Sequence, residues 1–134
     1  MEIKDILKKD EFNLLTSFSK EEIRWLNERI SIRKDGKFGI ECIVRGLNRD
    51  NDYFELKPEE IVRQLYAYQL IEKYHYPKEL LEFEVLTTFA GREKITDKRI
   101  DIAIYENSKK KKITTIIEVK RPSVIDENKT ENVS

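Results

Sequence analysis

Apolar residues recur at helical spacing in the first third of the chain. Ile3, Ile6 and Leu7 follow this spacing, and a second apolar stripe predicts a helix over residues 20–32. Ser19 and Glu22 precede that stripe as a capping box, in which both side chains satisfy free amides at the helix start. Residues 34–37 then predict a turn, and residues 38–44 predict a strand.

The pattern changes from helix to strand after residue 57. Pro58 suits the first turn of a helix, Glu59 and Glu60 complement its positive end, and the apolar stripe continues to about Tyr74. Three apolar runs follow, at 83–89, 98–105 and 113–120, separated by polar segments at 90–94 and 106–112. The predicted order is a helix followed by three strands in an antiparallel meander, which is an α+β fold.

Composition limits the class of protein without identifying it. The 134 residues suit one domain, which we divide into an N-terminal helical appendage (1–50), a core (51–125) and a polar tail (126–134). Lys and Arg balance Asp and Glu at 26 each, so there is no overall basic footprint for nucleic acid. Cys42 is the single cysteine, which rules out a disulfide within the chain, and there is neither a membrane-length apolar run nor a signal-peptide pattern. We expect a cytoplasmic protein.

Two carboxylates on the last two predicted strands provide the best clue to chemistry. If the hairpin is symmetric about residues 109 and 110, Asp101 lies opposite Glu118, with Cβ atoms about 4.5–5.5 Å apart. Such like charges repel, and a divalent cation would give the arrangement a reason, because Mg²⁺ favours one or two carboxylates plus waters and phosphate oxygens. Lys120 returns to the same face, where it could orient or deprotonate an attacking water and stabilise charge on a phosphate.

Glu-x-Lys alone has a simpler interpretation, because alternating charges often mark the solvated face of a strand. The apolar residues around it favour the chemical interpretation. Ile113, Ile116, Ile117 and Val119 predict a strand buried on both faces, where a charge is costly unless it is paired or metal-bound.

Four blocks of sequence, at 57–64, 76–84, 99–105 and 117–122, carry a family resemblance. In this order and spacing they closely resemble the N-terminal nuclease domain of the R subunit of type I restriction enzymes, over about residues 53–125. That domain belongs to the PD-(D/E)xK nuclease superfamily. The resemblance therefore implies a restriction-endonuclease-like core, in which a helix precedes a mainly antiparallel curved sheet.

The resemblance also implies a function, namely Mg²⁺-dependent hydrolysis of DNA phosphodiester bonds in a restriction-modification system. By position, Asp101 and Glu118 correspond to the metal ligands, Lys120 to the catalytic lysine, and Glu60 to an acidic residue that binds the metal or one of its waters. Gln64, one helical turn after Glu60, is a candidate for site support. The implied partners are double-stranded DNA and the modification and specificity subunits, and ATP would act only through a motor domain beyond residue 134.

Two positions depart from the family pattern. Ile100 stands where the superfamily name places Pro, and no Gln-x-x-x-Tyr motif follows Lys120. We therefore expect either an N-terminal piece of a larger protein or a reduced stand-alone relative.

Basic residues flank the predicted metal site and could contact a DNA backbone: Arg92, Lys94, Lys98 and Arg99. The alternative to a nuclease is a non-catalytic DNA-binding or docking module that keeps the fold, with its carboxylates paired to nearby Arg and Lys side chains.

Overall fold

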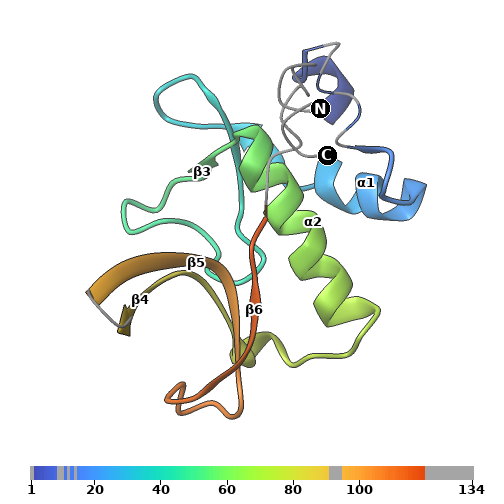
Figure 1. Ribbon diagram of the computed structural model, residues 1–134. Coiled ribbons are helices and arrows are strands. Elements are labelled where there is room, and N and C mark those ends of the chain that lie inside the picture. The colour runs from blue at the N-terminus through green and yellow to red at the C-terminus, as the bar shows by residue number, and fades with distance from the viewer. Residues whose placement is uncertain (1, 9–10, 12, 14, 91–94, 120–134) are drawn as a thin grey trace, which may run out of the picture.

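A computed structural model describes residues 2–8, 11, 13, 15–90 and 95–119 of the chain, and within them the side chains of residues 87–90 and 95–98 are not described. Helices and antiparallel strands both occur, so the fold is α+β (Figure 1). In chain order the elements are η1 (Ile3–Asp5), α1 (Lys20–Asn27), β1 (Ile30–Ile32), β2 (Phe38–Ile40), β3 (Phe54–Glu55), α2 (Pro58–Glu72), η3 (Lys78–Leu80), β4 (Leu81–Ala90), β5 (Ile95–Tyr105) and β6 (Ile113–Ile117). The described strands form two antiparallel sheets, β1-β2-β3 and β4-β5-β6. No helix in these ranges is long and apolar enough to cross a membrane.

The predicted capping box at the start of α1 is confirmed. The Ser19 hydroxyl accepts from the Glu22 amide at 3.2 Å, and Glu22 Oε1 accepts from the Ser19 amide at 3.0 Å. The predicted end of this helix is wrong, because α1 stops at Asn27 and residues 30–32 form strand β1. Ile30 pairs with Ile40 there, so cross-strand pairing outweighs the helical apolar spacing. The first apolar stripe forms only the short 3-10 helix η1.

The sequence predicts a helical appendage over residues 1–50. This segment is not purely helical, because it contains strands β1 and β2 of the small sheet β1-β2-β3. The strand predicted over residues 38–44 ends at Ile40. The chain then turns, and Cys42 forms an isolated bridge with Gly46, whose φ of 75° suits glycine. This turn brings residues 41–46 towards α2, where Ile43 contributes to the site described below.

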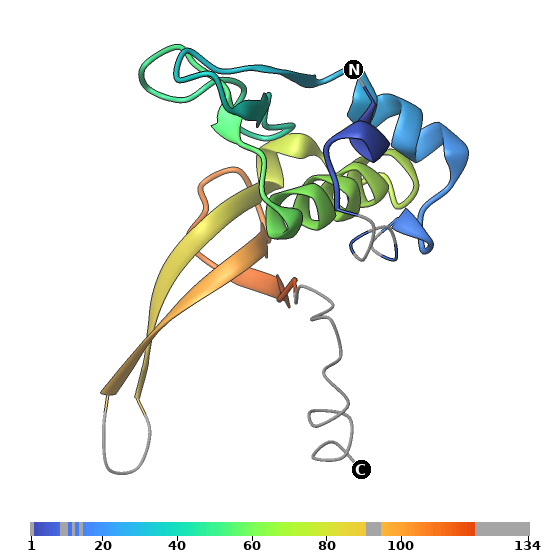
Figure 2. The same cartoon turned by 90° about the horizontal axis from the view of Figure 1, so that it is seen from above.

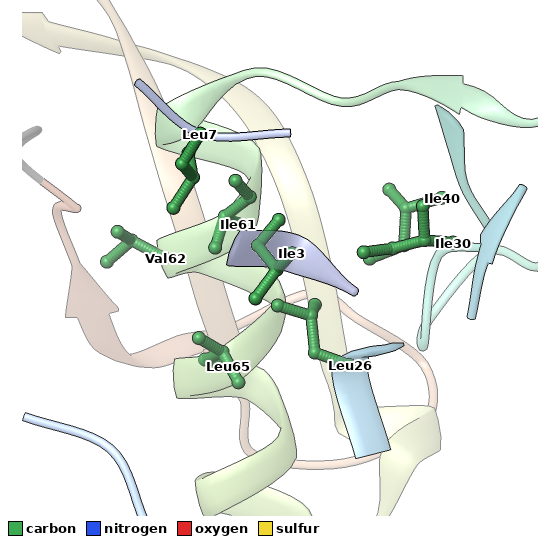
Figure 3. Close-up of a cluster of buried hydrophobic side chains, with 8 residues drawn as sticks. All are labelled: Ile3, Leu7, Leu26, Ile30, Ile40, Ile61, Val62 and Leu65. Atoms are coloured by element: carbon green, nitrogen blue, oxygen red, sulfur yellow. The ribbon is translucent and has the colours of Figure 1, made fainter. Parts of the chain in front are cut away.

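Helix α2 begins at Pro58 and ends at Glu72, close to the predicted bounds. It lies between α1 and the β4-β5-β6 sheet (Figure 1). Ile61, Val62 and Leu65 pack in a buried cluster with apolar residues of η1, α1, β1 and β2 (Figure 3). Ala67 instead joins a second buried cluster with β4 and β5. Because α2 contributes to both clusters, it ties the N-terminal elements to the sheet.

The sheet after α2 is the predicted antiparallel meander. β4 pairs with β5 from Leu81↔Ile104 to Ala90↔Ile95, whereas β6 pairs only with residues 102–105 of β5. Past β6, β4 and β5 continue as a two-stranded ribbon that extends away from α2 (Figure 2). One prediction about β6 is wrong, because it is not buried on both faces: Thr114, Thr115 and Ile116 are exposed. Among the described strands β6 pairs only with β5, and its neighbouring residues Thr114 and Thr115, which point to opposite faces, are both exposed.

Candidate active site

Asp101 lies where the three-stranded part of the sheet gives way to the ribbon. Ile102 pairs with Ile117, so the same register continued by one residue sets position 118 across from Asp101. β6 itself ends at Ile117, and the Val119 amide donates to Asp101 Oδ2 at 2.9 Å. Glu118 is exposed, and Lys120 lies outside the described residues. The Asp101 carboxylate therefore holds the backbone at Val119, the middle residue of the Glu-x-Lys triplet.

Asp101 also lines a pocket of about 360 Å³ between the start of α2, strand β3 and the sheet. Its charged lining comprises five carboxylates and three cations: Glu55, Glu59, Glu60, Glu84 and Asp101, with Lys57, Arg63 and Arg99. This is a formal excess of two negative charges. A site of that sign favours a cation over an anion as its first ligand.

Glu60 is buried in this pocket and its two oxygens already have hydrogen-bond donors. Arg63 donates from Nε to Oε2 at 2.9 Å and from Nη2 to Oε1. Gln64 donates from Nε2 to Oε2 at 3.1 Å, while its own Oε1 accepts from the Ile43 amide at 2.8 Å. Gln64, which is fully buried, thus links Glu60 to the turn after β2. Its predicted place, one turn after Glu60 on the same face, is confirmed.

Arg63 bridges the helix to the sheet. Its Nη1 donates to Glu84 Oε1 at 3.2 Å, and its guanidinium lies 5.0 Å from the centre of the Phe83 ring. Burial alone would lower the pKa of Arg63, but the hydrogen bond and charge of Glu60, with those of Glu84, outweigh burial and raise the pKa. Arg63 is therefore a permanent positive charge at this site.

Glu84 is part of the site although its position in the sequence does not indicate it. Phe83 pairs with Ile102 and Val85 with Ile100, which places Glu84 beside Asp101, yet the ladder lacks this pair. Glu84 has a φ of 55°, which a residue other than glycine adopts at a cost of about 1–3 kcal/mol. Arg45 donates to the preceding carbonyl, that of Phe83. Spacing within α2 could have indicated Arg63, three residues after Glu60, but the Glu84 contact joins distant segments.

The structure describes only part of the predicted DNA-binding set. Arg99 is exposed and lines the pocket beside Asp101. Lys98 pairs with Thr87 through the backbone in the ribbon, but its side chain is not described. Arg92 and Lys94 lie outside the described residues. Arg99 is thus the member of the set that is placed at the site.

The described carboxylates would suit a magnesium ion only in a sparse site, where the ion keeps most of its waters. Asp101 uses Oδ2 for the Val119 amide, and the described hydrogen bonds do not engage Oδ1. Among the described residues, no group of three or more His, Cys, Asp or Glu side chains could together hold a metal ion. A site here would therefore rest on one or two carboxylates plus water and phosphate oxygens, which is how Mg²⁺ is commonly bound at phosphate-processing sites.

The family described as the N terminus of the type I restriction enzyme R protein matches residues 58–133, which is more than half of the chain. The chain belongs to this family. The matched part of this R-protein N-terminal domain begins at the first residue of α2 and includes Glu60, Arg63, Glu84 and Asp101. No curated protein and no solved structure matches the chain. Family membership indicates a role in type I restriction.

Proposed function

We propose that this R-protein domain is a Mg²⁺-dependent endonuclease that hydrolyses phosphodiester bonds of double-stranded DNA, with a core of the PD-(D/E)xK type. The observation that carries the proposal is the hydrogen bond from the Val119 amide to Asp101. It ties the segment bearing Glu118 and Lys120 to a carboxylate inside an acidic pocket. The family match supports the same assignment, because a restriction system requires an enzyme that cuts DNA.

In this proposal Asp101 and Glu118 would hold the magnesium ion. A bound Mg²⁺ supplies Lewis-acid polarisation of the scissile phosphate and a more acidic water. Lys120 orients the attacking water and stabilises the charge that develops on the phosphate. Glu60 supports the site from α2; because Arg63 and Gln64 occupy its oxygens, its role is electrostatic and positional in the arrangement described here.

The DNA backbone would lie along the β4-β5 ribbon. Arg99, which lines the pocket, would contact a phosphate next to the scissile one, and Lys98, Arg92 and Lys94 would supply further phosphate contacts. Such contacts give sequence-independent affinity that falls as salt rises. Target choice would then come from the modification and specificity subunits, and ATP would act through a motor domain outside this chain.

Metal binding provides the first test. Isothermal titration of MgCl₂ should give a binding heat with the wild type that is lost in Asp101→Asn, which keeps the shape and an oxygen acceptor for the Val119 amide. Glu106→Gln is a suitable control, because it removes one exposed carboxylate from the strand connection and not from the pocket. Equal heats in wild type and Asp101→Asn would contradict the assigned ligand.

Cleavage provides the second test, in the full-length protein with its partner subunits. Lys120→Ala should lower the nicking rate by about 100-fold or more while DNA binding is kept. Undiminished cutting by Lys120→Ala would rule out its catalytic role.

One observation favours a second function, that of a non-catalytic DNA-binding or docking module. Two acids of the pocket, Glu60 and Glu84, are paired with Arg63, as a purely structural site would have them. This alternative predicts that Mg²⁺ produces no binding heat in either the wild type or Asp101→Asn, and that the folded domain still binds DNA or its partner subunit.

A further inference from the structure

Two cations of the pocket lining have described ion pairs, and Arg63 is the more deeply buried of the two. Its side chain is 13% exposed, against 64% for Lys57, the other paired cation of the lining. Its Glu60 partner is 11% exposed and its Glu84 partner 41%. A buried arginine between two acids interacts with little solvent screening, so its charge strongly affects anything else that enters the pocket.

All three nitrogens of the Arg63 guanidinium donate hydrogen bonds to carboxylates. Nε and Nη2 face Glu60 on α2, and Nη1 faces Glu84 on β4. The Phe83 ring covers it at 5.0 Å. A fixed positive charge therefore stands between two carboxylates in the same 360 Å³ pocket as Asp101.

A divalent ion entering beside Asp101 would be drawn by the same carboxylates that Arg63 already neutralises. It would also be repelled by the guanidinium, which stays protonated and so keeps its positive charge. We propose that Arg63 is the resident counter-ion of this pocket and sets its affinity for a divalent cation by offsetting part of the negative charge of Glu60 and Glu84. This inference rests on the proposed function, because it concerns the metal that the nuclease would use.

The proposal assigns Arg63 a positioning and affinity-setting role rather than a catalytic one. It predicts that loss of the charge strengthens metal binding, in contrast to loss of a ligand. Removing one positive charge from the pocket should raise its affinity for a doubly charged ion by about tenfold or more. A purely structural arginine would have the opposite effect or none, since its loss would only disorder the acids around it.

The experiment compares variants by isothermal titration of MgCl₂ and, separately, MnCl₂. Arg63→Gln should bind at least about tenfold more tightly than the wild type, whereas Arg63→Lys, which keeps the charge, should remain within about threefold. Arg29→Gln is a matched control, because Arg29 is also an ion-paired arginine, with Glu41, but it lies outside this pocket. Its affinity for the metal should equal that of the wild type.

Arg63→Gln leaves the buried Glu60 without its ion-pair partner and could unfold the domain. A measurement on the wild type removes this dependence. In a heteronuclear NMR titration with MgCl₂, the Nε–H signal of Arg63, identified by its loss in Arg63→Lys, should shift progressively with the ion, because its acceptor Glu60 responds to the new charge.

Each outcome bears on the inference. Tighter binding by Arg63→Gln, or a shift of the Arg63 signal if that variant does not fold, supports it. Wild-type binding with an unmoved Arg63 signal and no gain in a folded Arg63→Gln overturns it and leaves the proposed nuclease intact. Absence of binding in the wild type and in a folded Arg63→Gln overturns both.

Discussion

Gln64 allows the buried polar network to be tested with a change of one atom. Gln64→Glu keeps the shape of the side chain, so one oxygen still accepts from the Ile43 amide. The second oxygen replaces Nε2, which stands 3.1 Å from Glu60 Oε2. A hydrogen bond therefore becomes a contact between two acceptors, which is tolerated only if the introduced carboxyl keeps its proton.

The cost of this substitution depends on pH, and its sign follows from linkage. Burial and the nearby Glu60 both disfavour ionisation, so the folded-state pKa of the introduced carboxyl should lie well above its usual value. Below the unfolded pKa of about 4.3 the variant should be nearly as stable as the wild type. As pH rises, the lost stability grows until the folded-state pKa is passed, reaching about 3–4 kcal/mol near pH 7.5.

Urea unfolding followed by circular dichroism, at about pH 4 and about pH 7.5, measures this difference. Gln64→Met is the control: it loses both hydrogen bonds at any pH and should cost about 2 kcal/mol at both values. A gap between Gln64→Glu and the wild type that does not change with pH would refute the described contact between Gln64 and Glu60.

Three further predictions concern the frame around the site. Burial, followed by the hydrogen bond and charge of Glu82, raises the pKa of Tyr105 to about 12. The folding stability that depends on neutral Tyr105 should therefore be complete below about pH 10 and be lost as pH rises towards 12. An absorbance titration should show a late-titrating tyrosine that is absent in Tyr105→Phe; an unchanged curve would contradict the assignment. Ser19→Ala should cost about 1 kcal/mol in urea unfolding through loss of the α1 cap, whereas Ser19→Asp should restore most of it. Gly39→Ala should cost about 1–3 kcal/mol of folding stability, because a Cβ there would lie 2.6 Å from Tyr53 Cβ. Gly36→Ala is the comparison that separates crowding from backbone strain, because Gly36 has open space around it but a φ of 85°.

The elements that sequence predicts well are those with strong local signals. Pro58 and the acidic residues after it begin α2, and Ser19 begins α1, because helix ends are governed by nearby hydrogen bonds and charges. The β5-β6 register is likewise local, since a short polar connection limits the pairings available. β1 is different: Ile30 continues the helical apolar stripe, and pairing with β2 across the next turn makes these residues extended instead.

The same distinction explains the site. Asp101 and position 118 come together through one hairpin, so their relation could be derived from residue counting. Arg63 and Glu84 are 21 positions apart and meet only because α2 packs on the sheet. The exposure of β6 could not be foreseen from its isoleucines, because it depends on how many strands flank it in the sheet.

Strand β5 is supported differently along its length. In the described ladders, residues 102–104 have paired strands on both sides, whereas residues 95–100 pair only with β4, and two-stranded ribbons are barely stable on their own. Amide hydrogens should therefore exchange faster step by step from Tyr105 to Ile95. Asp101 is the first residue past the part of β5 that is paired on both sides. Bending of the ribbon relative to the rest of the sheet should therefore reorient this carboxylate before it disturbs the buried interior.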